Sequence, residues 1–174
     1  MGRPFWRPLD DAAPPFYESA SLGDLLRAWW DEPGLQEKAP KEERVRALSR
    51  WVEDHERTGA KWVGAKHPLL SLCGEDLLEA WGDKTRWLWS YRPPEQSIRS
   101  LTSLGWWPGR EEFVQRRLWD AATRFFAGRE HLRVQLADLI SDPSREVDRI
   151  VRYLGVAPTD EQVRAAIRCI RPRT

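Results

Sequence analysis

The sequence has few cysteines and histidines and no long apolar run. Its 174 residues include two cysteines, Cys73 and Cys169, and three histidines, and neither cysteine has a second Cys or His at metal-ligand spacing. A zinc centre or a disulfide framework is therefore not expected, and both cysteines are predicted to be small buried apolar side chains. The longest apolar runs are only a few residues long. Because a helix needs about 20 apolar residues to cross a bilayer, no membrane partner is predicted.

Two further features are missing: a secretory leader and an excess of charge. The first residues, Met-Gly-Arg-Pro-Phe-Trp, contain no apolar stretch of the signal-peptide type, so a reducing, cytoplasmic location is predicted. The 28 Lys and Arg residues nearly cancel the 27 Asp and Glu residues, which leaves a formal charge of +1. Such a balance gives no broad positive field for a nucleic-acid backbone, so nucleic acid is not an expected partner.

Tryptophan, in contrast, is abundant, with 11 residues in the chain. One interpretation is that these rings are large core and boundary side chains whose N–H groups find acceptors. The other is that some of them line an aromatic cleft that stacks on a planar or sugar-like ligand. The sequence alone leaves both interpretations open.

The N-terminal third of the chain is predicted to be irregular and then helical. Residues 1–18 are rich in proline without periodicity, which predicts an irregular arm. Residues 19–57 show apolar side chains at helical spacing, interrupted at Pro33-Gly34, which predicts two amphipathic helices. The dense Lys, Glu and Arg residues of the second helix, 41–57, are predicted to form a solvated face.

The remainder, residues 61–174, is predicted to be an α/β core within one domain. Residues 61–66 and 85–91 read as strands on either side of a helix over 70–81, which is the pattern of a right-handed crossover between parallel strands. A third strand is expected at 131–136, with helices before and after it. This alternation predicts an α/β fold in which a parallel sheet is flanked by helices.

Candidate binding groups follow the predicted strands. In an open parallel sheet, ligands bind beyond the carboxyl ends of the strands, where Lys66–Pro68 and Arg92 are expected. The Arg92 guanidinium and the Ser100 hydroxyl, two turns into the next helix, can converge on one phosphate-sized anion, with help from the amides of the helix start. The alternative is that Arg92 pairs with a nearby carboxylate. Asp138 and Asp142 are expected to cap helices rather than to touch a ligand.

Four segments together resemble the sulfotransferases that use 3′-phosphoadenosine 5′-phosphosulfate (PAPS). In that family a strand ending in Arg, with Ser eight positions later, binds the 3′-phosphate of the nucleotide, and Arg92 and Ser100 stand at that separation. Pro93 departs from the acidic or similar residue that is usual after the Arg. The other similar segments are Pro15–Ser19, Lys66–Pro68, and Val134–Pro143 with the helix end at Tyr153–Gly155.

The resemblance implies a P-loop-NTPase-like sulfotransferase fold, PAPS as the donor, no metal, and a small-molecule or glycan-like acceptor. It implies that Arg92 and Ser100 hold the 3′-phosphate and that Lys66 offsets negative charge on the transferring sulfuryl group. The base for the acceptor hydroxyl is either Glu18, by resemblance, or His67, by its pKa near neutrality. Structural alternatives are a helix N-terminal carboxylate for Glu18 and a turn residue for His67.

One departure from the family affects the expected activity. The family begins with a strand and a Gly-rich loop that cradles the 5′-phosphosulfate, whereas the glycines of this sequence are scattered singly. The fold is therefore expected to be N-terminally incomplete: the chain is truncated, a partner supplies the loop, or the transfer reaction has been lost. A missing central strand would also leave an exposed sheet edge that favours self-association.

Two other functions remain open at the level of the sequence. The first is a non-catalytic binding or scaffolding protein on a degenerate sulfotransferase fold, which would use a Trp-lined cleft. The second is an unrelated small α/β interaction domain in which the four similarities arose by chance.

Overall fold

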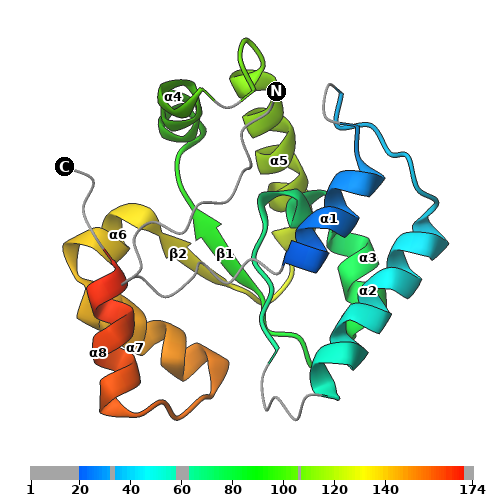
Figure 1. The fold of residues 1–174 in the computed structure, drawn as a ribbon. Coiled ribbons are helices and arrows are strands. Elements are labelled where there is room, and N and C mark those ends of the chain that lie inside the picture. The colour runs from blue at the N-terminus through cyan, green and yellow to red at the C-terminus, as the bar shows by residue number, and fades with distance from the viewer. Residues whose placement is uncertain (1–19, 32–33, 58–62, 106, 171–174) are drawn as a thin grey trace. The chain divides into compact units, whose positions relative to one another are not determined.

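The computed structural model describes residues 20–31, 34–57, 63–105 and 107–170 (Figure 1). The chain divides into two compact units, an N-terminal unit, Met1–Gly82, and a C-terminal unit, Asp83–Thr174, and each is described by itself. The predicted arm at 1–18, with the candidate base Glu18, lies outside the described residues.

Over its described residues, 20–31, 34–57 and 63–82, the regular structure of the N-terminal unit is helical. Its elements are α1 (Ala20–Trp29), α2 (Lys41–Glu56), the short 3₁₀ helix η1 (Pro68–Cys73) and α3 (Gly74–Trp81). These elements confirm the helices predicted from the apolar spacing, except that the first part of the helix predicted over 70–81 belongs to the 3₁₀ helix η1. The side chains that make the core of this unit are mainly leucine and tryptophan: Leu22, Leu26, Trp29, Trp30, Leu35, Leu48, Trp51, Leu69, Cys73 and Leu77.

The first predicted strand is wrong over the part that the structure describes. Residues 63–66 have no regular structure, although their side chains alternate between half-buried and exposed as in a strand. Gly64 disfavours extended pairing, and Pro68 starts η1 directly afterwards. The predicted crossover from this segment to residues 85–91 is therefore not formed.

The C-terminal unit contains two short parallel strands, β1 (Leu88–Tyr91) and β2 (Leu132–Gln135), which pair with Leu88 opposite Leu132 and Tyr91 opposite Gln135. Between them the chain forms α4 (Pro94–Leu104) and α5 (Glu111–Phe126), so this crossover joins the parallel strands. Three more helices follow: α6 (Leu136–Ser141), α7 (Pro143–Leu154) and α8 (Asp160–Cys169). The chain is thus mixed α/β and mostly helical, with a small parallel sheet.

The ends of α7 and α8 follow from local sequence signals. The Asp142 carboxylate accepts a hydrogen bond from the Arg145 backbone N–H, which confirms its predicted cap. Gly155 ends α7 in the left-handed conformation, with φ of 67°. Thr159 begins α8 with a reciprocal capping box to Gln162. Asp138 differs from its prediction, because it lies inside α6, whose N-cap residue is Gln135.

The burial of the cysteines and tryptophans tests the predictions made for them from the sequence. Cys73 is buried, as predicted, and burial raises the pKa of its thiol to about 12. Cys169 is exposed at the end of α8, so its predicted burial is wrong. Trp29, Trp30 and Trp51 are buried in the N-terminal unit, which favours the core interpretation for these rings.

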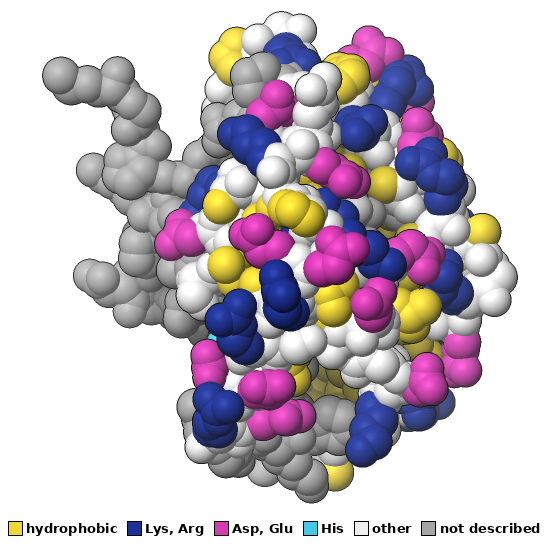
Figure 2. Space-filling model, turned by 90° about the vertical axis from the view of Figure 1, so that its right-hand side faces the viewer, with side chains coloured by type: hydrophobic (Ala, Val, Ile, Leu, Met, Phe, Trp, Pro, Cys, Tyr) yellow, Lys and Arg dark blue, Asp and Glu magenta, His cyan; other side chains and the backbone are white. Residues whose placement is uncertain are grey.

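The surface agrees with the near-zero net charge. Basic and acidic side chains are interspersed over the face drawn in Figure 2, and the apolar areas between them are small and separate. Among the helices that the structure describes, none is both long and apolar enough to cross a membrane.

Candidate functional site

The structure places Arg92 and Ser100 in one unit, in the order that the sequence predicts. β1 ends at Tyr91, Arg92 follows it directly, and α4 begins at Pro94. Ser100 lies in the second turn of α4, and both candidate side chains are half-buried. In Figure 1, α4 lies beyond the carboxyl end of β1. This is the position in which parallel-sheet proteins hold anionic ligands.

The start of α4 contributes less positive potential than expected. Pro93 and Pro94 have no backbone N–H group. The N–H groups of Gln96 and Ser97 both donate to the Pro93 carbonyl oxygen, at 3.0 and 3.1 Å. Glu95 adds a carboxylate in the first turn. An anion at this helix start would therefore depend mainly on side chains, not on backbone amides.

The other candidate residues of the described chain, Lys66 and His67, belong to the N-terminal unit. Lys66 is exposed in the irregular segment before η1. His67 is the N-cap of η1, and its Nδ1 accepts a hydrogen bond of 3.1 Å from the Leu69 backbone N–H. This contact agrees with the structural alternative for His67, in which it is a turn residue and not a base. A role as base at Nδ1 would require the cap to be broken, because one lone pair cannot serve both purposes.

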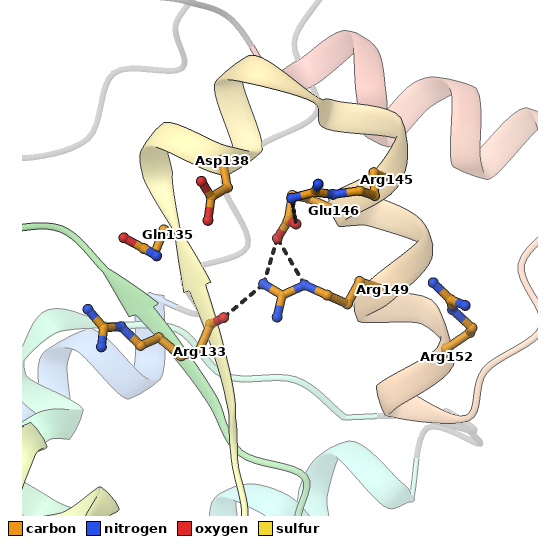
Figure 3. A pocket seen from close by; sticks show the side chains of 7 residues that line it. All are labelled: Arg133, Gln135, Asp138, Arg145, Glu146, Arg149 and Arg152. Carbon is orange, nitrogen blue, oxygen red and sulfur yellow. Dashed lines mark hydrogen bonds and ion pairs between the residues drawn. The ribbon is translucent and has the colours of Figure 1, made fainter.

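A second polar cluster, which the sequence did not reveal, lies on α7 and the neighbouring segments. It forms an open depression of about 380 Å³ that we call the arginine pocket. Figure 3 shows its lining side chains, which come from β2, α6 and α7. They are Arg133, Gln135, Asp138, Arg145, Glu146, Arg149 and Arg152.

Glu146 organises the arginine pocket although it has almost no contact with solvent. Its side chain is 1% exposed because arginines cover it. Arg149 donates to Glu146 Oε2 from Nη2 at 2.6 Å and from Nε at 3.1 Å. Arg145 Nη2 lies 3.4 Å from the other oxygen, Oε1. Hydrogen bonding from Arg149 lowers the pKa of Glu146 more than desolvation raises it, so the carboxylate is ionised at neutral pH.

The pocket is joined to the sheet through Arg133. The Arg133 carbonyl oxygen accepts a hydrogen bond of 2.8 Å from Arg149 Nη2, so this arginine links α7 to β2. The Arg133 guanidinium points the other way, toward β1 (Figure 3), and stacks 3.4 Å from the centre of the Tyr91 ring. Arg133 therefore contributes its backbone carbonyl group to the pocket, whereas its charged guanidinium lies over the Tyr91 ring.

A pattern that could have indicated this pocket is present in the sequence. Arg145, Arg149 and Arg152 stand at i, i+4 and i+7, which places them along one side of a helix. The same spacing is common on ordinary solvated helices, so the pattern alone does not distinguish a site from a surface. What distinguishes them is the covered Glu146, and burial of one glutamate among exposed charges is not visible in a sequence.

The arginines of the pocket and Arg92 are the kind of side chain that suits an anionic ligand. Over residues 20–31, 34–57, 63–105 and 107–170, no group of three or more His, Cys, Asp or Glu side chains is placed to hold a metal ion. Comparison of the chain with models of protein families, with curated proteins and with solved structures finds no match.

Proposed function

We propose that the chain binds PAPS or its product, adenosine 3′,5′-bisphosphate, and serves sulfuryl transfer to a hydroxyl or amine. The proposal rests on Arg92 and Ser100, which would hold the 3′-phosphate. The observation that carries it is their placement: Arg92 follows the carboxyl end of a parallel strand, and Ser100 lies two turns into the next helix. A phosphate at this position suits the planar, permanently charged guanidinium of Arg92.

The structure at the start of α4 restricts which groups can bind the 3′-phosphate. Because the first amides of the helix are occupied by the Pro93 carbonyl oxygen, the energy of 3′-phosphate binding has to come mostly from Arg92 and the Ser100 hydroxyl. Loss of Arg92 should then remove most of the recognition. In a site dominated by backbone amides, the same substitution would have a smaller effect.

The transfer step assigns provisional roles to other residues. Lys66 would offset charge on the sulfuryl group, and Glu18 or His67 would take the proton from the acceptor. Since the sequence contains no Gly-rich loop for the 5′-phosphosulfate, we expect this chain alone to bind the nucleotide and to turn it over barely or not at all. A binding protein without catalysis is the second candidate, favoured by the same missing loop.

Calorimetric titration with adenosine 3′,5′-bisphosphate tests the proposal. Arg92→Ala should weaken binding by about 1.5–3 kcal/mol, the range of a charge-assisted contact, and Ser100→Ala by about 1 kcal/mol. Arg99→Ala is the matched control, because Arg99 lies on the exposed side of α4 and its substitution removes the same charge. Equal losses in Arg92→Ala and Arg99→Ala would contradict a specific 3′-phosphate site.

A sulfate-transfer assay with PAPS and model hydroxyl acceptors separates the two candidates. Turnover, even slow, that falls further in Lys66→Ala would favour the enzyme. Binding of the bisphosphate without any turnover would leave only a binding role for this chain by itself. Absence of nucleotide binding would contradict both.

A further inference from the structure

We propose that the arginine pocket is a second site, which binds a phosphate or sulfate group through Arg145, Arg149 and Arg152. Neither Arg92 nor Ser100 lines this pocket, so the inference goes beyond the proposed nucleotide site. The ligand class is a doubly charged tetrahedral oxyanion, either free or as part of a small molecule.

The helix itself brings the three cations together. Arg145, Arg149 and Arg152 lie on successive turns of α7, on one side of the helix, while Val147 on another side is buried. All three line the same depression. A ligand there would meet several forked donors whose spacing is fixed by one rigid element.

Arg149 is held in place before any ligand arrives. Its Nε and Nη2 atoms bond Glu146 and the Arg133 carbonyl oxygen, whereas none of the residues that the structure describes accepts a hydrogen bond from its Nη1. The side chain is 37% exposed, so Nη1 can be reached by solvent. A donor whose rotamer is already fixed loses little entropy when it binds, which favours affinity for an anion.

Arg145 and Arg152 supply charge that is only weakly committed. Arg145 makes one long contact to Glu146 and is 65% exposed. Arg152 pairs with Asp148 at 2.9 Å, but both side chains are mostly exposed, and such surface pairs contribute little. Both guanidinium groups can therefore turn toward a ligand at small cost.

The balance of charge on α7 favours an anionic ligand. Its three arginines exceed its two carboxylates, Glu146 and Asp148, so this side of the pocket retains one positive charge that attracts an anion. Asp138, the other lining carboxylate, would repel that anion. Removing its charge with Asp138→Asn should therefore strengthen anion binding by about twofold to fivefold, as expected for a partly screened like charge.

Titration of the full chain with inorganic phosphate, followed through the backbone amides of α7 by NMR at constant ionic strength, tests the proposal. Arg145→Gln combined with Arg152→Gln should weaken phosphate binding by about tenfold or more. Inorganic sulfate should compete with phosphate for the pocket and shift the same α7 amide signals, whereas acetate should not. Both substituted side chains are exposed, so we expect the fold to be preserved, and a circular dichroism spectrum checks this.

Arg124→Gln with Arg117→Gln on α5 is the matched control, because both arginines are exposed and outside the pocket. An equal loss of phosphate binding in the control and in the pocket variant would show that binding depends on the net charge of the protein and not on the pocket. That result would overturn the proposal. So would phosphate shifts that vanish in Arg92→Ala and persist in the pocket variant. In that last case, the phosphate site at Arg92 would stand and the arginine pocket would fall.

Discussion

Each unit of this protein contains a carboxylate shielded from water by arginine, and the two clusters differ in what remains free. In the N-terminal unit Asp76 pairs with Arg44, and both side chains are 5% exposed. In the C-terminal unit Glu146 is as well shielded, but its partner Arg149 is 37% exposed. The same two kinds of group thus make a closed pair in one unit and an open cluster in the other.

The closed pair uses nearly all of the arginine's donors. Arg44 Nε lies 2.7 Å from Asp76 Oδ2, and Nη2 lies 3.4 Å from Oδ1. Its Nη1 bonds the Ala39 carbonyl oxygen at 2.7 Å and approaches Glu37 at 3.2 Å. Burial lowers the pKa of Arg44, but hydrogen bonding and attraction by Asp76 and Glu37 outweigh it and raise the pKa above its ordinary value. At most one N–H of Nη2 is left over, and the side chain is 5% exposed, so the role of this pair is to join α2 to α3.

The open cluster around Glu146, in contrast, leaves part of its arginine unused. Glu146 fixes one edge of the Arg149 guanidinium, and Nη1 has no acceptor in the described part of the chain. A shielded acid that positions an incompletely used arginine leaves a fixed donor for an anion. In a nearly saturated buried pair, removal of the acid leaves a buried charge without its partner. The comparison therefore predicts different consequences when each acid is removed.

The largest effect is expected from Asp76→Ala. It leaves the Arg44 charge buried without its main partner, which should lower the free energy of unfolding by about 3–5 kcal/mol. Chemical denaturation of the full chain measures this loss. Asp54→Ala is the matched control, since Asp54 pairs with Arg57 in the same unit and is 68% exposed, and it should change stability by less than about 0.5 kcal/mol. Similar losses in the two variants would remove the distinction between a closed pair and a surface pair.

A smaller effect is expected from Glu146→Gln, because water can solvate the exposed arginines that remain. At pH 7 the loss should be about 1–2 kcal/mol. The lowered pKa of Glu146 gives the pH dependence: its contribution is present above the ordinary value of 4.5 and is lost as pH falls through the lower folded-state value. Wild type and Glu146→Gln should therefore approach each other in stability below pH 4.5.

Denaturation curves from pH 7 to pH 3 measure this convergence. Glu112→Gln is the control, since Glu112 pairs with Arg116 on α5 at the surface. A stability difference between wild type and Glu146→Gln that stays constant down to pH 3 would show that the ionised carboxylate contributes nothing special.

The helices could be predicted from the sequence because their signals are local. Apolar spacing, Pro94 near a helix start and Gly155 after a helix end each act within a few residues. The strand at 61–66 could not be excluded in this way, because a strand depends on a partner that the local pattern does not contain. Residues 63–66 have the alternation of a strand without the pairing.

The charged side chains show the other limit of sequence reasoning. The charges of α2 were predicted to form a solvated face, but Arg44 on that helix is buried against Asp76, 32 positions away in sequence. Glu146 was hidden in the same way within a helix rich in charge. Periodicity identifies apolar faces well, whereas burial of a charge depends on a distant or covering partner. The placement of Arg92 and Ser100 was predictable because it needs only a strand end and a helix start.

The contrast between the closed pair and the open cluster is tested most directly by an NMR spectrum of the arginine Nε–H groups during titration with inorganic phosphate. The account predicts that the Arg44 signal stays fixed and exchanges slowly with solvent, because both side chains of its pair are buried. It predicts that the signals of Arg145 and Arg152 move with a common dissociation constant. Arginine signals of both units that move alike, or pocket signals that do not move, would contradict the account.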